Sequence, residues 1–341
     1  MSQVPPDSPR TEPPIFEIAP RLGRLPFWPI AHGPTPVHPL AGYGDRVWVK
    51  RDDLVSPIYG GNKVRRWEWL LADARARGKS HLFTVGGLGS TQVTSLTMHG
   101  EALGFRVSAV LFDQPQTAFV DEALACDEAH GAHVALGHGY ARTAALSVRE
   151  ILRERPYVIA PGASGPLANL AYVDAALELG RQVAAGLAPR PDAIVVACGS
   201  GGTAVGLAIG MRLLGWDTEI VAVRITDLAV SNPATLKLAE LATLRRLARE
   251  GARIPGRTRA RVRMEHRFVG AGYGFATPEA ERGAAKYGEL FGVPGEVTYS
   301  GKALAALDRL VAEDAGRTLL FWTTLSTTGR SRSSEPGVPL R

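Results

Sequence analysis

The sequence predicts an α/β protein with two domains, each built on a mostly parallel, twisted β-sheet. From residue 47 to residue 322, short apolar segments alternate with segments that have the apolar spacing of helices. Some of the short segments, such as residues 194–197, are apolar at every position, which is typical of strands covered on both faces. With 341 residues, the chain is long enough for one large or two moderate domains.

Strands and helices are expected to alternate along most of the chain. A proline-rich irregular stretch at 25–40 and a short strand at 47–49 lead into a glycine turn and a helix that begins near residue 63. Apolar runs predict further strands at 82–85, 107–112, 132–136, 158–160, 194–197, 220–223 and 319–322. Helical spacing predicts helices at 90–103, 118–130, 142–154, 167–185, 204–214, 233–249, 279–291 and 304–313. The polar ends, 1–20 and 326–341, are expected to be a disordered arm and a disordered tail.

The composition indicates an ordinary globular chain in a reducing compartment. Hydrophobic residues make up 45% and charged residues 21%, and no apolar run is long enough to span a bilayer. The first residues lack the apolar core of a secretory signal. Only Cys126 and Cys198 are cysteines, which argues against a disulfide framework. We therefore expect a cytoplasmic protein with no membrane partner.

The net charge of +6 raises the question of nucleic-acid binding. Most arginines are scattered, and local density occurs only at residues 244–263. That segment has no interleaved aromatic residues and no helix-turn-helix pattern, so a solvated basic helix and loop is the better interpretation. No nucleic-acid partner is predicted.

The stretch GGNKVRRWE, residues 60–68, places a lysine where a tight turn enters a helix. Gly60 and Gly61 allow turn conformations closed to other residues, and Asn62 is a plausible helix cap. A turn at Lys63 followed by a packed helix suits an amine that attacks an aldehyde cofactor. The same pattern also fits a solvated lysine in the first turn of a surface helix.

The stretch CGSGGT, residues 198–203, follows a buried strand and opens a helix. Its glycines let the backbone approach an anion, because N–H groups at a helix N-terminus donate to it. Ser200 and Thr203 add hydroxyls, and the lysine of a nucleotide P-loop is missing. Such turns also serve close helix–strand packing alone. A turn lysine and an anion loop after separate strands together indicate a cofactor with an aldehyde and a phosphate, namely pyridoxal phosphate.

These motifs make the chain resemble the fold-type II pyridoxal-phosphate enzymes, which share a tryptophan synthase β-like fold. Within that group it is similar to the 1-aminocyclopropane-1-carboxylate deaminase / D-cysteine desulfhydrase family over most of its length. The motifs that carry the resemblance are Pro34-Thr35-Pro36, KRDDL at 50–54, GGNKVR at 60–65, GG at 86–87 followed by Ser90, Gly199–Thr203 with Gly206-Leu207, GYG at 272–274 and YSGKA at 299–303. The resemblance implies that the cofactor lies in the cleft between two domains.

The resemblance also implies a role for each matching residue. Lys63 would hold the cofactor through its amine and move protons at the substrate. Ser90 would contact the substrate carboxylate or share in proton transfer, and Tyr273 and Tyr299 would line the substrate side. The cofactor-binding residues that it implies are Lys63, Asn62, Thr91, Gly199, Ser200, Gly201, Gly202, Thr203, Ser300 and Thr323.

Ser300 bears on the reaction, since it falls where the family places a carboxylate or a hydroxyl near the pyridine nitrogen. Ring-opening deaminases are expected to carry glutamate there, and desulfhydrase-like members a hydroxyl. The resemblance therefore implies removal of the α-proton of a small amino acid, elimination of a β-substituent, and release of ammonia and an α-keto acid. The alternatives are a true cyclopropane-carboxylate deaminase and a cofactor-binding protein that has lost turnover.

Two departures from the family pattern motivate that last alternative. The family has Ser-Asn-His where this chain has Ser90-Thr91-Gln92, and His-Thr-Gly-Gly where it has Trp322-Thr323-Thr324-Leu325. Thr91 is shorter than asparagine, and the missing glycines leave less room near the C-terminus. Substrate identity is therefore the part of the prediction that these positions affect most.

The resemblance further implies a discontinuous large cofactor-binding domain, residues 21–65 and 177–325, with a small domain at 66–176, and a homodimer. No metal site is predicted. Cys126, His130 and His133 lie close together in sequence, but Gly131 breaks the element between the two histidines. Asp52 and Asp53 are expected to be structural partners of nearby cations, because neighbouring strand residues point to opposite faces.

Overall fold

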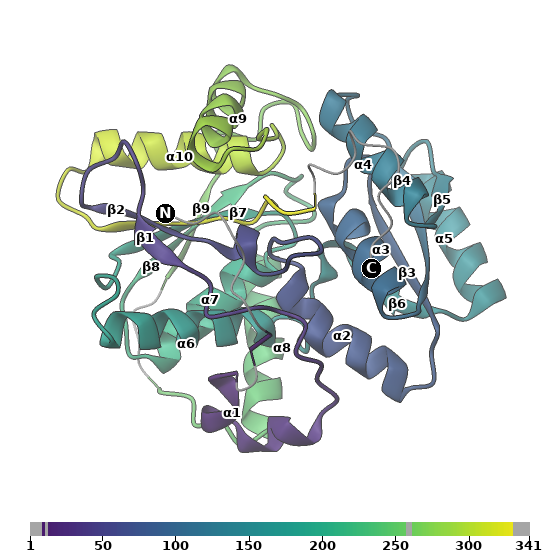
Figure 1. Cartoon of the computed structure of the whole chain (residues 1–341), viewed down its shortest axis with the longest axis horizontal. Coiled ribbons are helices and arrows are strands. Elements are labelled where there is room, and N and C mark those ends of the chain that lie inside the picture. Colours follow the sequence, from purple (N-terminus) through teal and green to yellow (C-terminus); the bar gives the residue numbers. More distant parts are fainter. Residues whose placement is uncertain (1–8, 11–12, 257–260, 330–341) are drawn as a thin grey trace.

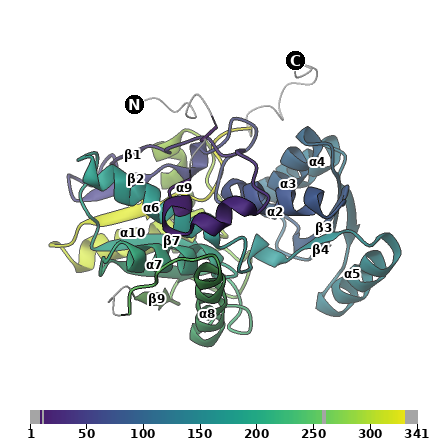
Figure 2. The same ribbon diagram turned by 90° about the horizontal axis from the view of Figure 1, so that it is seen from below.

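The computed structural model describes residues 9–10, 13–256 and 261–329. Within them, two β-sheets lie side by side, with helix α2 (Val64–Ala76) between them (Figures 1 and 2). Trp67 and Leu71 of α2 pack against the smaller sheet, whereas Trp69 joins the core of the larger one. Helix α2 therefore connects the two halves directly after the lysine turn.

The larger sheet has six strands among the described residues, in the order β1-β2-β10-β7-β8-β9. Only β1 and β2 pair antiparallel, and the other neighbours are parallel. Its strands are β1 (Val37–Pro39), β2 (Val47–Lys50), β7 (Ala193–Cys198), β8 (Glu219–Arg224), β9 (Val262–Glu265) and β10 (Leu319–Trp322). The predicted α/β class with mostly parallel sheets is confirmed.

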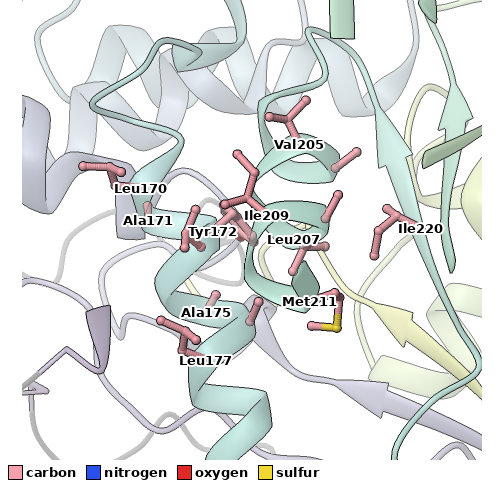
Figure 3. Packing of buried hydrophobic residues seen from close by; sticks show 14 of the residues in the cluster. Leu170, Ala171, Tyr172, Ala175, Leu177, Val205, Leu207, Ile209, Met211 and Ile220 are labelled. Carbon is pink, nitrogen blue, oxygen red and sulfur yellow. The ribbon is translucent and has the colours of Figure 1, made fainter. Parts of the chain in front are cut away.

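Helices cover both faces of this sheet, which explains its uniformly apolar strands. Ile194 and Val196 point into the core formed with α6 (Leu170–Ala184), α7 (Gly202–Leu213) and α8 (Pro233–Arg249). Val195 and Ala197 point into the core formed with α9 (Pro278–Phe291) and α10 (Ser300–Glu313). Figure 3 shows α6 and α7 packing side by side in the first of these cores, with Ile220 of β8 against them.

The smaller sheet has four parallel strands among the described residues, in the order β5-β4-β3-β6. They are β3 (His81–Gly87), β4 (Arg106–Phe112), β5 (His133–Leu136) and β6 (Tyr157–Ile159). Helices α2, α3 (Thr91–Ala102) and α4 (Ala118–Ala129) pack on one face, where Val107, Ala109 and Leu111 point. On the other face, α5 (Tyr140–Glu154) lies over a cavity of about 190 Å³.

Both predicted disordered ends contain ordered residues. Short helices occupy Ile15–Ile18 (α1) and Pro20–Arg24 (η1), and the N–H of Ile15 donates to Asp174 on α6 at 2.9 Å. Arg10 forms ion pairs with Glu68 and Asp174. The prediction of disorder was wrong for these residues because burial of Ile15 and pairing of Arg10 both require α2 and α6. Residues 1–8 and 11–12 lie outside the described part of the chain.

At the other end, Ser326 is buried, and its hydroxyl accepts the N–H of Gly60 at 2.7 Å. The prediction of a disordered tail from residue 326 was therefore wrong for residues 326–329, which hold the start of the lysine turn. Residues 330–341 lie outside the described part.

The basic segment at 244–263 also differs from expectation at its end. Helix α8 stops at Arg249, and Val262–Glu265 forms strand β9 at one edge of the larger sheet. An edge strand has one solvated side, so its polar sequence carries little of the apolar signal by which buried strands are found. Residues 257–260 lie outside the described part.

The predicted domain limits stay a prediction, and we propose to move one of them. Residue 176 falls inside α6, whose residues Leu170 and Tyr172 pack with α7 under the larger sheet. We therefore place the return to the larger unit before Leu170 rather than at residue 177. Among the described helices, none combines the length and hydropathy that a bilayer crossing demands.

Asp127 on α4 is a buried carboxyl group whose oxygens have no hydrogen-bond partner among the described residues. Burial raises the pKa of Asp127 to about 7. The folded chain thus holds a proton that the unfolded chain loses near pH 4, so this group's contribution to stability falls between about pH 4 and pH 7. Urea unfolding gives the free energy of unfolding of Asp127→Asn and of the wild type at each pH. We expect the difference, variant minus wild type, to be larger at pH 8 than at pH 5 by on the order of 2 kcal/mol. An equal difference at both pH values would contradict this.

Candidate active site

The lysine turn is held by contacts that leave no space for side chains at its two glycines. A Cβ on Gly60 would lie 1.8 Å from the carbonyl oxygen of Asp53, and one on Gly61 would lie 2.6 Å from that of Thr324. Gly61 also has a φ of +86°, which glycine adopts without strain. The glycines therefore let the backbone pack between two other segments and deliver Lys63 to a defined place.

Lys63 is half-buried at the cavity wall, and its Nζ donates a hydrogen bond to Oδ1 of Asn62 at 2.9 Å. Burial, and then the charge of Arg66, lower the pKa of Lys63 well below its usual value. A lysine with a lowered pKa supplies a neutral amine near pH 7, which is the nucleophilic form. The interpretation as a solvated surface lysine is therefore wrong.

The sequence predicted that Asn62 caps the helix, and this prediction is wrong. Lys63 occupies the position before α2, and no side chain caps it in the described structure. The Asn62 amide instead donates to the hydroxyl of Thr203 at 3.2 Å while its carbonyl accepts from Lys63. Asn62 therefore links the lysine turn to the glycine loop, which lies about 140 residues away in the sequence.

The glycine loop connects the end of β7 to the start of α7. Gly201 has a φ of +85°, and a Cβ there would lie 2.0 Å from Leu236. A Cβ on Gly202 would lie 2.4 Å from Oδ1 of Asn169. The loop and Lys63 line one cavity, with Gly199, Ser200, Thr203, Asn62, Thr91 and Tyr299 in its wall. The two motifs that the sequence singled out thus meet in one place.

A second cavity of about 270 Å³ adjoins the first. Lys63, Thr91, Gly199, Ser200 and Tyr299 line both. Gly162 also lines both, and further chamber residues such as Ser90, Phe112 and Asp227 lie at or just beyond the carboxyl ends of strands from both sheets. We call the first space the loop cavity and the second the chamber. Open α/β sheets bind ligands at this end of their strands.

Comparison with known proteins agrees with this geometry. Residues 29–322 match the family model described as pyridoxal-phosphate dependent enzyme. This chain belongs to that family. It is 37% identical, over 90% of its length and 94% of the relative's, to a nocardicin C-9′ epimerase of Nocardia uniformis subsp. tsuyamanensis. Among solved structures it is similar to an ACC deaminase homologue, with a TM-score of 0.77, 26% identity, and 94% of this chain and 96% of the other covered.

A second solved structure supports the fold alone. It is an O-ureido-L-serine synthase with a TM-score of 0.60 and 17% identity, covering 97% of this chain and 98% of the other. The family match and the similarity to the ACC deaminase homologue confirm the predicted fold-type II architecture and the predicted cofactor.

The residues of this pyridoxal-phosphate dependent enzyme fit the cofactor. The glycine loop offers N–H groups and hydroxyls to a phosphate, and the amine of Lys63 opens to the same cavity. The φ of +85° at Gly201 disfavours any residue with a Cβ, and a Cβ on Gly202 would overlap the side chains of Asn169 and Ser164. Burial and the charge of Arg66 both shift the pKa of Lys63 in the direction that favours the neutral amine.

Arg66 is a site residue that the sequence did not reveal. It is buried, its Nη2 donates to the hydroxyl of Thr203 at 2.6 Å, and its Nη1 donates to the carbonyl of Gly162 at 2.7 Å. Burial lowers the pKa of Arg66 to about 10, so the guanidinium stays charged beside the loop. Adjacent helix residues diverge by about 100°, which sends Arg66 into the loop cavity while Arg65 points elsewhere.

We expect Arg66→Met to raise the pyridoxal phosphate concentration needed for half-saturation of the apoenzyme by about 10–100-fold, because a hydrogen bond to a charged group is lost. Titration followed by visible absorbance measures this. Arg75→Met, on the exposed side of the same helix, should leave half-saturation unchanged. Equal values for the two variants would remove Arg66 from the anion site.

The residues predicted to lie on the substrate side are close together in the structure. Their roles stay predictions. Ser90, Tyr273 and Tyr299 all line the chamber, and the two tyrosine hydroxyls lie 3.0 Å apart. Burial raises the pKa of Tyr273 to about 12 and that of Tyr299 well above its usual value. Both hydroxyls therefore stay protonated near pH 7 and can donate protons rather than accept them.

Two predicted cofactor residues are not brought to the site. The hydroxyl of Ser300 donates to the carbonyl of Glu296 at 3.0 Å, and that of Thr323 donates to Asp53 at 2.6 Å. Neither residue is in the described wall of the loop cavity, where Glu296 and Thr324 lie instead. The sequence alone could not show this, because Ser300 is the first residue of α10 and its side chain turns back to the preceding loop. The assignment of both residues to the cofactor stays a prediction, and these contacts do not support it.

The departures at Thr91 and Gln92 have separate outcomes. Thr91 lines both cavities, and its contact with the cofactor stays a prediction. The amide of Gln92 donates to Thr84 at 2.6 Å and to the carbonyl of Ala160 at 3.2 Å. It thereby joins β3 to the segment after β6, which is a structural role.

A buried charge network lies beneath the lysine turn. Arg65 donates to both Asp52 and Glu178 at 2.9 Å, and Lys50 donates to Glu178 at 2.6 Å. Asp52 and Asp53 belong to a 3₁₀ turn, η2 (Asp52–Leu54), and not to a strand as the sequence suggested. Burial alone would raise the pKa of Glu178, but Arg65 and Lys50 lower it well below its usual value. The network ties β2, α2 and α6 together, and with them the position of Lys63.

Proposed function

We propose that the chain removes the α-proton of an amino acid with the amine of Lys63 and then eliminates a substituent from the β-carbon. The products are the released substituent and, after addition of water, ammonia and an α-keto acid, as in a D-cysteine desulfhydrase. The observation that carries the proposal is that Lys63 lies where the loop cavity and the chamber meet, with a lowered pKa. A base there faces a substrate in the chamber and a cofactor on the loop at once.

The other residues of the chamber supply the remaining steps. Helix α3 begins beside the chamber with Ser90 before it, and the Ser90 side chain makes no capping bond in the described structure. Its hydroxyl and the first N–H groups of α3 are therefore available to a substrate carboxylate. Bound pyridoxal phosphate supplies an electron-accepting ring that stabilises negative charge at the α-carbon. Tyr299 and Tyr273 hold protons that a leaving group needs as its bond to the β-carbon breaks.

A second candidate reaction is epimerisation, favoured by the similarity to the nocardicin C-9′ epimerase. It shares the first step, since the α-proton must leave before it can return on the opposite face. Here a tyrosine hydroxyl would return the proton, and no bond at the β-carbon would break. Ring opening of 1-aminocyclopropane-1-carboxylate is a further candidate, motivated by the structural similarity to an ACC deaminase homologue.

One experiment separates these reactions from one another and from a catalytically silent protein. The holoenzyme is incubated in D₂O with each enantiomer of cysteine and alanine and with 1-aminocyclopropane-1-carboxylate. The products are followed by NMR and a keto-acid assay. Pyruvate from D-cysteine supports elimination, deuterium with loss of chirality in alanine supports epimerisation, and a four-carbon keto acid supports ring opening. Unchanged substrates throughout, with the cofactor bound, would refute all three.

A further inference from the structure

The chamber extends beyond the cofactor loop. Its walls reach from Lys63 and Ser200 to Phe112, Tyr140 and Asp227, and the cofactor and the substrate share its volume of about 270 Å³. A cysteine side chain holds only one carbon and one sulfur, so it would cover little of the wall that Phe112 and Tyr140 form. An apolar substrate side chain that covered this wall would gain binding free energy in proportion to the area buried.

One wall of the chamber is a continuous row of aromatic rings. The ring centroids of Tyr299 and Tyr273 are 5.9 Å apart, those of Tyr273 and Phe112 are 5.5 Å apart, and those of Phe112 and Tyr140 are 5.6 Å apart. Tyr299 also lines the loop cavity, whereas the side chain of Tyr140 is 68% exposed. The row therefore runs from beside the cofactor site to the mouth of the chamber. Edge-to-face and tilted contacts of this kind suit a further ring laid against them.

The row ends at a carboxylate. Asp227, in the loop after β8, accepts a hydrogen bond from the hydroxyl of Tyr140 at 3.3 Å. Tyr140 belongs to α5, which packs on the smaller sheet, so this bond joins the two halves of the molecule across the mouth. Burial and the charge of Asp227 raise the pKa of Tyr140, which keeps its hydroxyl a donor. The described chain places Asp227 in no ion pair, which leaves its charge available to a ligand.

We propose that the chamber selects amino acids whose side chain has a ring-sized apolar body and carries a cation or hydrogen-bond donor at its far end for Asp227. This inference rests on the proposed function, because it assumes that the α-carbon lies at Lys63. Phe112 and Tyr140 contact the apolar body, and Asp227 binds the cation or donor at its far end. In the elimination reaction, the apolar body is part of the leaving group.

Exchange of the α-proton for deuterium tests the inference, because it needs no leaving group. The holoenzyme is compared on alanine, phenylalanine and 4-(aminomethyl)phenylalanine, each as both enantiomers. Burial of a phenyl group predicts at least about 10-fold higher kcat/KM for phenylalanine than for alanine. A partly exposed ion pair predicts up to about 5-fold more for the amine.

The variant Asp227→Asn should reduce the ratio of amine to phenylalanine to below about 2, since the attraction to the ammonium group is lost. Asp217→Asn, an exposed aspartate paired with Arg190 outside the chamber, should keep the wild-type ratio. Exchange of alanine as fast as phenylalanine would overturn the inference and leave the proposed function standing. A ratio insensitive to Asp227→Asn would overturn the role of that residue. No exchange with any amino acid would overturn the proposed function, and this inference with it.

Discussion

Replacement of Lys63 by alanine is expected to reduce α-proton exchange by at least about 10³-fold, because both the covalent hold on the cofactor and the base are lost. Lys63 is the amine that the loop cavity and the chamber share. The visible absorbance of protein-bound pyridoxal phosphate should change with it. The phosphate site formed by the loop and Arg66 should persist, so Lys63→Ala should still retain some cofactor through non-covalent contacts.

Absorbance spectra and borohydride trapping measure this directly. In the wild type, trapping should add the mass of the cofactor to the peptide that contains Lys63, and in Lys63→Ala it should add none. Lys237→Ala, an exposed lysine paired with Glu240, should behave as the wild type in both measurements. A trapped peptide in Lys63→Ala, or full activity there, would mean that another residue holds the cofactor.

The second large effect is expected on stability. Arg65→Met removes the cation between Asp52 and Glu178 and fills part of the same volume, so two carboxylates are left buried beside only Lys50. Loss of one partner from a buried ion pair costs about 3–5 kcal/mol, which would be a large share of the stability of an ordinary domain. The free energy of unfolding from urea titration measures this loss.

A matched control lies directly after the last residue of the same helix. Arg77 pairs with Asp73 at 2.9 Å, but its side chain is 66% exposed. Arg77→Met should therefore cost no more than about 0.5 kcal/mol, because water screens such a pair. If Arg65→Met cost as little as Arg77→Met, the network would be no more than a set of solvated contacts, and its role in positioning the turn would fall.

Much of the fold follows from local sequence. Runs such as residues 194–197 are apolar on both sides, and the structure places Val195 and Ile194 in cores on opposite faces of one sheet. Helical spacing likewise located α8 and α9 to within a residue at their ends. These elements were predictable because the spacing of apolar residues along a short segment shows which of its faces are buried.

Elements whose order depends on distant partners were not predictable. The segment around Ile15 reads as a polar arm, yet Ile15 is buried in the core of the larger sheet and its N–H donates to Asp174 on α6. Ser326 reads as the start of a loose tail, yet it holds Gly60. Strand β9 is short and polar because it lies at a sheet edge.

In the site, too, some residues were predictable from local sequence and others were not. Lys63 and the loop Gly199–Thr203 stand out in the sequence because turns, glycines and neighbouring apolar runs mark them locally. By itself the sequence determined the α/β class, the mostly parallel sheets, the family and its cofactor, since each depends on patterns or motifs within short stretches. Only the tertiary structure decided that Arg66 reaches the loop cavity, that Ser300 and Thr323 turn away from it, and that four aromatic rings lead to Asp227. The physical reason is that a side chain's direction and partners depend on how far separated segments pack, which no local pattern records.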